Sequence, residues 1–324
     1  MLIKNTKAFL ISVDTEGDNL WEWDKRNPIN THNSQYIPRF QKLCDKYGFK
    51  PTYLVNYEMI NDKSFVIFLN NVLARNGCEV GMHLHAWNTP PIKQLDKRCD
   101  GIEEGLPYIT EYETNDIDDK VNHLTGLIKN NIGVLPVTHR AGRWATNEVY
   151  AKILEKYGYK YDCSFTPGLS WDNNPGFTNG SRGTDYSSYD NSVRDFYGTK
   201  MIEIPLPSYS NKRIKKENIH GLKSFLKNII YARKRKQMVQ LRPNGHNLND
   251  LLYIVKKNRK SNEDYLMFML HSSEFMPGGS PNFKTVEDIE NLYSDLEIIF
   301  GKINKHYIGM TIGEYGERIS RGNK

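Results

Sequence analysis

Acidic and imidazole side chains follow short apolar runs at separate places along the 324-residue chain. Asp14 and Glu16 come directly after the run Phe9–Val13 and are two residues apart. His83 and His85, again two apart, lie toward the end of another apolar segment. Residues two apart on an extended backbone point to the same side, so each pair presents two polar groups to one face.

These residue types fit metal-assisted acid–base chemistry. The imidazoles of His83 and His85 could be two ligands of one metal. Asp14 and Glu16 are a possible pairing of a base and a metal ligand. The alternative is that one histidine ends its strand while the other forms a hydrogen bond in a loop, since histidine has many structural uses. The carboxylate pair at another strand end favours the metal site.

Further ionisable groups follow two later strands. His271 comes after the apolar run Tyr265–Leu270, and a histidine near its ordinary pKa can donate a proton to an amine leaving group at neutral pH. Arg140 and Arg143 lie at a strand-to-helix turn, where their planar, paired donors could hold a carboxylate or a phosphate. A surface ion pair is the alternative use of these arginines.

The elements that must position these groups alternate between strands and amphipathic helices, which predicts an α/β fold with a parallel sheet. Chemistry in such sheets is placed at the carboxyl ends of the strands. The expected strands are 9–13, 50–56, 78–87, 133–138, 159–163, 201–205 and, as the final strand, 265–270. The expected helices are 35–47, 64–75, 115–131, 146–157 with Thr146 as its N-cap, 248–258 and 286–300.

Two segments interrupt the alternation. Residues 164–200 lack a sustained period but contain many tyrosines and Trp171, which indicates an ordered loop that covers the substrate. Residues 212–242 combine a run of lysine and arginine with apolar residues at helical spacing, which predicts a basic helix. We expect this helix to pack on the body of the protein. Peripheral contact with an anionic membrane, or binding of a lipid-linked substrate, is the alternative.

Composition excludes several classes of protein. The net charge of +6 is too small and too dispersed to indicate a nucleic-acid partner. The cysteines, at positions 44, 78, 99 and 163, are scattered without a C-x-x-C pair and are expected to be reduced thiols. No signal peptide is visible and no apolar run has the length of a membrane span, so we expect a cytoplasmic protein.

Five motifs occur in a fixed order over about residues 7–275. They are S-V-D-T-E-G, E-V-G-M-H-L-H-A-W, H-R-A-G-R-W, Y-D-C-S and M-L-H-S-S-E. Together they resemble the motifs of the polysaccharide deacetylases, the NodB-homology group called carbohydrate esterase family four. Within that group the chain is similar to the WbmS-like branch, which is met among surface-polysaccharide biosynthesis proteins.

The resemblance implies a distorted parallel (β/α) barrel, here one domain over residues 1–324, that hydrolyses an acetyl group from a sugar. Carried onto this chain, it implies that Asp14 is the general base and that Arg140 orients it. His271 matches the general acid, with Asp162 or Asp172 to orient that histidine. The expected substrate is an acetylated sugar or glycan, free or linked to a nucleotide or a lipid.

The resemblance also implies a divalent metal, often zinc, held by Glu16, His83 and His85. Members of the group usually have histidines four apart and adjacent aspartates, whereas this chain has H-L-H and D-T-E. Loops that follow strand ends often carry substrate contacts. The residues expected to make such contacts are Trp87, Arg143, Trp144 and Trp171.

Three other functions remain open at this point. A glycosidase needs two carboxylates that flank the scissile bond, about 5 to 10 Å apart, and Asp14 with Glu16 do not suggest that arrangement. A metal-free amidase acting on a small or cyclic amide would use His83 and His85 to bind its substrate. A non-catalytic glycan-binding barrel would retain binding without Asp14 and His271, whereas an enzyme would lose turnover.

Overall fold

The structure is a computed structural model that describes residues 6–22, 27–92, 106–211 and 237–322. The strands of its main sheet are β1 (Lys7–Thr15), β2 (Pro51–Val55), β3 (Glu79–Leu84), β4 (Thr138–Ala141), β5 (Tyr161–Asp162), β6 (Arg194–Asp195), β7 (Ile202–Glu203), β10 (Tyr265–His271) and β11 (Tyr307–Met310). The helices are α1 (Ile37–Tyr47), α2 (Tyr57–Asn61), α3 (Lys63–Leu73), α4 (Thr114–Ile132), α5 (Glu148–Lys156), α7 (Leu248–Arg259), α8 (Val286–Ile303) and α9 (Ile312–Gly322).

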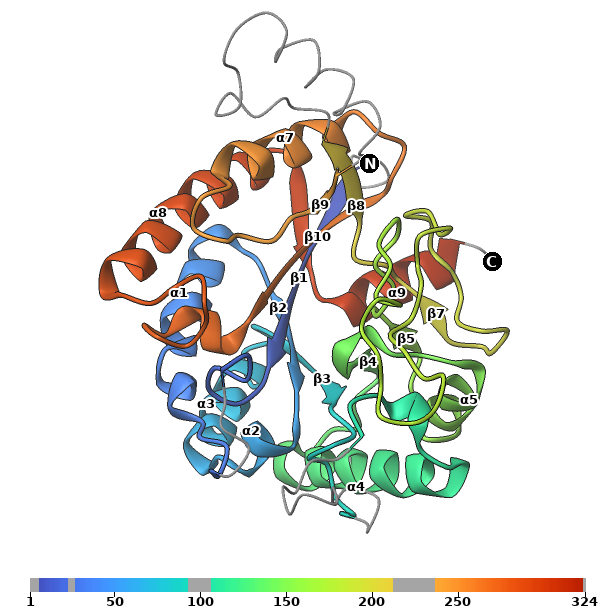
Figure 1. Ribbon diagram of the computed structural model, residues 1–324. Coiled ribbons are helices and arrows are strands. Elements are labelled where there is room, and N and C mark those ends of the chain that lie inside the picture. Colours follow the sequence, from blue (N-terminus) through green and yellow to red (C-terminus); the bar gives the residue numbers. More distant parts are fainter. Residues whose placement is uncertain (1–5, 23–26, 93–105, 212–236, 323–324) are drawn as a thin grey trace, which may run out of the picture.

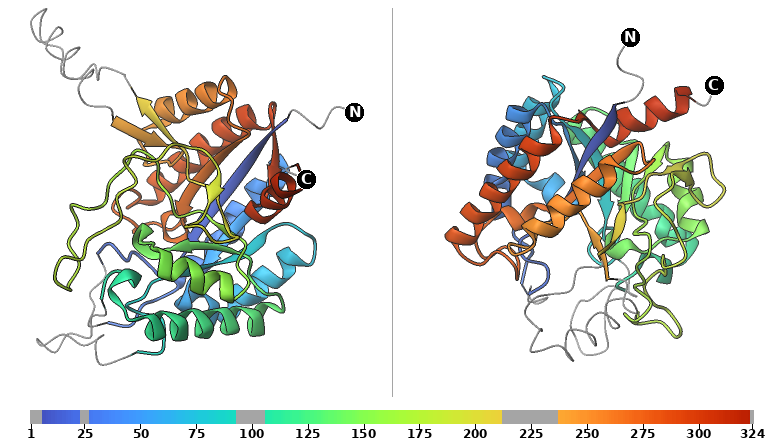
Figure 2. Two further views of the ribbon diagram at one scale, coloured as in Figure 1. Left: turned by 90° about the vertical axis from the view of Figure 1, so that its right-hand side faces the viewer. Right: turned by 90° about the horizontal axis from the view of Figure 1, so that it is seen from above.

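The strands form a curled, mostly parallel sheet in the order β10-β1-β2-β3-β4-β5-β7-β6, with β11 paired to β1. Only the pair β6–β7 is antiparallel within this sheet. The helices lie around the strands, as Figure 1 and the two views of Figure 2 show. The predicted α/β fold, a distorted parallel barrel, is thereby confirmed.

Strand β1 pairs with three strands of this sheet, β10, β2 and β11. Its alternate side chains enter two separate apolar clusters. Phe9 and Ile11 pack in the cluster that includes the helices α1 and α8, while Leu10 packs in a smaller cluster with residues of β5, β10 and α9. Burial on both faces explains why β1 reads as one continuous apolar run.

The chain continues beyond the expected final strand. Strand β11 pairs with the first half of β1, and Ile312 and Tyr315 of α9 are buried in the smaller apolar cluster. The sequence analysis missed both elements, and it was wrong to treat 265–270 as the final strand. Helix α2, a single short helix after β2, was also missed.

Strand β4 begins at Thr138, five residues later than expected. Helix α4 ends with Gly133 in the left-handed conformation (φ 81°), and the following Val134 and Leu135 are exposed. Their apolar character suggested a strand, but the residues that pair with β3 and β5 are buried and, except for Ala141, polar. Thr146 is not the N-cap of α5. Asn147 takes that position, and its side chain accepts a hydrogen bond from the backbone N–H of Tyr150.

Most of the basic segment 212–242 lies outside the described residues. Where the description resumes, residues Gln237–Gln240 form strand β9, which pairs antiparallel with β8 (Ser208–Asn211). The helix prediction is therefore wrong for these four residues. Within the described ranges, no helix has the length and apolar content that crossing a bilayer requires.

Candidate active site

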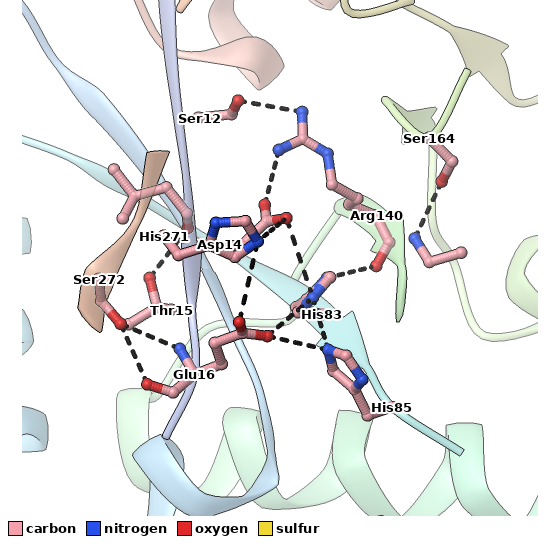
Figure 3. Close-up of polar contacts among 12 residues, drawn as sticks. Ser12, Asp14, Thr15, Glu16, His83, His85, Arg140, Ser164, His271 and Ser272 are labelled. Atoms are coloured by element: carbon pink, nitrogen blue, oxygen red, sulfur yellow. Dashed lines mark hydrogen bonds and ion pairs between the residues drawn. The ribbon is translucent and has the colours of Figure 1, made fainter. Parts of the chain in front are cut away.

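The polar residues singled out in the sequence meet at the carboxyl ends of β1, β3, β4 and β10 (Figure 3). Strand register brings them together, because Asp14 of β1 lies opposite His271 of β10. In the same way His83 of β3 lies opposite Arg140 of β4. The prediction that these strand ends converge is confirmed by the geometry.

Glu16, His83 and His85 form a group that can hold a metal ion. The Nε2 atoms of the two histidines are 3.0 Å apart, and the Oε2 atom of Glu16 lies 2.9 Å from His85 and 3.5 Å from His83. Ligands held tetrahedrally about 2.0–2.1 Å from zinc would be separated by about 3.3 Å. One carboxylate and two imidazoles also suit zinc chemically. These residues therefore fit the metal that the resemblance implies.

The two histidines have different partners at their second nitrogen. His83 Nδ1 lies 3.0 Å from the carbonyl oxygen of Arg140, so its N–H donates there and leaves the Nε2 lone pair toward Glu16. His85 Nδ1 instead accepts a hydrogen bond of 3.1 Å from the indole N–H of Trp87. The proton of neutral His85 then belongs on Nε2, where it is donated to Glu16. A metal at this position would displace that proton.

Asp14 is held by Arg140, whose side chain is completely buried. Arg140 Nη1 donates to Asp14 Oδ1 at 2.6 Å, while Nη2 donates to Ser12 Oγ and Nε to the carbonyl oxygen of Cys163, each at 3.0 Å. Every edge of the guanidinium thus has a partner on β1 or directly after β5. This geometry agrees with the expectation that Arg140 orients Asp14.

The carboxyl groups of Asp14 and Glu16 are held in the ionised form despite their burial. Burial alone would raise the pKa of Asp14, but Arg140, with smaller effects from His83 and His271, holds it below its ordinary value. Burial would also raise the pKa of Glu16, but His271, His83 and His85 hold it well below its ordinary value. Two charged carboxylates therefore face the same histidines.

The turn after β4 allows a close approach to His85. A Cβ atom at Gly142 would lie 2.6 Å from the carbonyl oxygen of Leu84 and 3.0 Å from Cγ of His85, so only glycine fits there. The next two residues, Arg143 and Trp144, have left-handed φ angles of 54° and 59°. Such conformations are sparsely populated for side chains other than glycine and are typical of functional sites.

His271 is oriented by Glu274, which the sequence analysis did not propose. Glu274 Oε2 accepts the backbone N–H of His271 at 2.9 Å and lies 3.1 Å from its Nδ1. Glu274 belongs to the short helix η6 (Ser272–Phe275), which folds the chain back toward the histidine. Arg242 Nη2 also lies 3.0 Å from His271 Nδ1 and 3.5 Å from Glu274 Oε2.

The expectation that Asp162 or Asp172 orients His271 is wrong. Asp162 is buried one strand beyond β4, where its carboxylate contacts His139 Nδ1 at 2.5 Å and accepts the backbone N–H of Ser164. Asp172 bonds to Ser170 at the exposed surface of the 164–200 loop. The signal that could have identified Glu274 is its spacing three residues after the strand end, which is that of a capping box.

The site opens into a cavity of about 630 Å³. Asp14, Glu16, His83, His85 and His271 form part of its lining, whereas Arg140 lies behind them. The four residues expected to contact substrate all line it as well. Further lining residues that the sequence analysis did not commit to are Leu20, Trp21, Tyr108, Ala141, Asn174, Pro175 and Arg242.

The 164–200 segment does form part of the cavity wall, as its aromatic content suggested. Trp171 stacks on Trp144 with ring centroids 6.3 Å apart and an interplanar angle of 11°. Its indole N–H donates to Thr166, and Phe165 and Tyr186 anchor the segment in the apolar core. Apart from the short strand β6 this segment has no regular element, so it is an ordered loop.

Comparison with known proteins gave no matching family model and no curated relative. Solved structures do match. A protein from Mycobacterium smegmatis assigned to the polysaccharide deacetylases is 11% identical with a TM-score of 0.52, over 100% of this chain and 94% of that one. The fold is that of the polysaccharide deacetylases.

Two other solved structures extend this comparison. A GH57 branching enzyme from Thermococcus kodakaraensis is 10% identical with a TM-score of 0.53, over 96% of this chain and 71% of that one. The Xyl-CE4 domain of a xylanase from the hindgut metagenome of Trinervitermes trinervoides is 14% identical with a TM-score of 0.44, over 98% and 92% of the two chains. Because a deacetylase and a branching enzyme share this fold, the reaction has to be argued from the site.

Replacing Trp87 by phenylalanine should tighten zinc binding. The change removes the N–H that keeps the proton of His85 on Nε2, and one such hydrogen bond contributes about 0.5–1.5 kcal/mol. We expect the zinc dissociation constant, measured by competition with a chelating dye, to fall by about twofold to tenfold. Trp171→Phe is the matched control, because its N–H bonds to Thr166. Weaker zinc binding in Trp87→Phe would refute this account of His85.

Replacing Glu274 by glutamine should separate two kinds of acetyl substrate. An amide needs a proton for its departing amine, so loss of the carboxylate that orients His271 should lower kcat by about tenfold or more. Hydrolysis of 4-nitrophenyl acetate should change little, because its phenolate leaves without a proton. Asp172→Asn should leave both rates unchanged, and equal losses on both substrates in Glu274→Gln would contradict the assignment.

Proposed function

We propose that the protein is a metal-dependent hydrolase that removes an acetyl group from the nitrogen of an acetylated sugar. The observation that carries this proposal is the convergence of three kinds of group in one cavity. A potential metal-ligand set (Glu16, His83, His85) lies beside a charged base (Asp14) and the imidazole of His271 from the neighbouring strand β10. His271 Nε2 lies 3.9 Å from Asp14 Oδ2 and 3.8 Å from Glu16 Oε1.

A divalent metal, when bound by Glu16, His83 and His85, would polarise the acetyl carbonyl and make water more acidic. Asp14 accepts a proton from the attacking water, and Arg140 holds the carboxylate in the orientation that this transfer needs. The low pKa of Asp14 makes it a weak base, so its role depends on that increase in water acidity. Indole and phenol rings around the cavity exclude bulk water and contact the sugar.

His271 donates a proton to the departing amine. Its Nε2 faces the carboxylates of Asp14 and Glu16, while its Nδ1 lies 3.1 Å from Glu274 Oε2. As the amine takes the proton from Nε2, the carbon–nitrogen bond breaks and acetate is released. The acid and the base thus come from neighbouring strands, β10 and β1, at positions that lie opposite each other.

The metal-free amidase remains the second candidate function, because one contact favours it. The hydrogen bond from Trp87 places a proton on His85 Nε2, so His85 can act as a donor to Glu16 or to a substrate carbonyl. A glycosidase is less well supported despite the fold that this chain shares with a branching enzyme. Asp14 and Glu16 lie near each other at the end of one strand, so they do not flank a scissile bond. Arg140 is a partner of Asp14, and histidines are partners of Glu16.

We further place the reaction in surface-polysaccharide or glycan biosynthesis in the cytoplasm, on a sugar that is free or linked to a nucleotide or a lipid. The resemblance of the ordered motifs to the WbmS-like branch supports this placement. The alternative of membrane contact through residues 212–242 stays a prediction, because most of that segment lies outside the described residues.

Asp14→Asn and His271→Gln should each lower acetate release by about 10² to 10⁴, the range typical of a lost general base or acid. Acetate release from N-acetylated glucosamine oligomers by the zinc-loaded protein is the measurement. Lys152→Gln, which removes only an exposed ion pair with Glu148, should retain the full rate. Circular dichroism establishes that each variant is folded. Near-normal turnover in folded Asp14→Asn would contradict the proposal.

A further inference from the structure

Two arginines line the cavity from different parts of the chain. Arg143 belongs to the turn η4 (Gly142–Trp144) after β4, near His85 and the hydroxyl of Tyr108. Arg242 follows β9 and lies against His271 and Glu274. One guanidinium therefore lies on the His85 side of the site and the other on the His271 side. The proposed reaction, on a neutral acetamido group, uses neither charge.

The position of Arg242 is fixed by the fold. The preceding Leu241 is completely buried and bridges to Phe268 of β10. The backbone N–H of Arg242 donates to Gln240 at 2.8 Å, and its carbonyl oxygen accepts the side-chain amide of Asn247 at 2.9 Å. The side chain of Arg242 is about 30% exposed and lines the cavity, so a bound molecule can reach it.

The charges around the cavity leave Arg143 without an acidic partner. Asp14 is matched by Arg140, Glu274 is matched by Arg242, and the carboxylate of Glu16 lies against His83 and His85. Among the described residues no carboxylate forms an ion pair with Arg143, although the side chain is exposed at the cavity rim. The surface ion pair that the sequence left as an alternative is thus not found in the described part of the chain. A divalent metal would add two further positive charges.

We propose that the acetylated sugar carries a negatively charged group, a phosphate or a carboxylate, that Arg143 and Arg242 bind. This inference rests on the proposed function. Guanidinium groups recognise such oxyanions through paired, planar hydrogen bonds. The cavity, at about 630 Å³, has the volume of ordinary ligand sites, and aromatic rings in the same wall suit the apolar face of a sugar ring. A sugar phosphate and a sugar acid share this chemistry.

The test compares a neutral acetamido sugar with two relatives that carry an anionic group. N-acetylglucosamine, its 1-phosphate and the corresponding uronate are titrated calorimetrically into Asp14→Asn protein, in which turnover is slow and whose fold is first verified by circular dichroism. Each titration is repeated with a chelator, because a phosphate could also contact a bound metal. We expect at least one charged sugar to bind tenfold or more tightly than the neutral sugar, with and without chelator. The phosphate and uronate arms identify which anion is preferred.

Substitutions of the two arginines complete the test. Arg143→Gln and Arg242→Gln should each weaken binding of the preferred charged sugar by about tenfold more than they weaken binding of the neutral sugar, whereas Lys152→Gln should change neither. Equal affinity for all three sugars, or charged-sugar binding that survives both arginine changes, overturns the inference.

The outcome can be separated from that of the proposed function. If the wild-type protein releases acetate from neutral and charged sugars with the same kcat/KM, the deacetylase function holds and the anion site is refuted. If arginine-dependent binding is observed but no acetate is released from any of the three sugars, the anion site holds and the proposed reaction is refuted.

Discussion

The buried ion pair between Asp14 and Arg140 is the interaction on which the arrangement of the site depends. Both side chains are removed from water, and loss of either partner would leave an unpaired buried charge, which costs about 3–5 kcal/mol. The same guanidinium also bonds to Ser12 and to the carbonyl oxygen of Cys163. It therefore joins β1 to the chain that leaves β5 across the inside of the curled sheet. The carboxylate of Asp14 is fixed and charged as a consequence.

Strand pairing then brings the remaining groups to this charge. Because neighbouring parallel strands end at one edge, Asp14 lies opposite His271, and His83 lies opposite Arg140. Glu16 is held where β1 ends, since its backbone N–H and carbonyl both bond to the Ser272 hydroxyl of the neighbouring chain segment. Gly142 lets the turn after β4 approach His85 closely. The site is thus a product of register and close packing at four strand ends.

The sequence predicts the part of this arrangement that depends on local pattern. Apolar runs that end in Asp14, His83 and His271 indicate strand ends. Because Glu16 and His85 each follow two residues after the first member of their pair, both members of a pair lie on one face of the strand. Contacts that form where the chain folds back on itself could not be predicted in this way. Glu274 reaches His271 only because η6 folds back, and Arg242 follows a segment whose helical spacing concealed strand β9. Strand β11 was missed because its four residues pair with β1 from far along the chain.

The most direct test of this account is the metal content of protein purified without a histidine tag or chelator, measured beside His83→Ala. His83 offers an unprotonated Nε2 within 3.5 Å of both Glu16 and His85, so its loss should remove the metal. The account predicts about one equivalent of zinc or another divalent transition metal in the wild-type protein and none in the variant. Wild-type protein that holds no metal, and gains no activity when zinc is added, would contradict it.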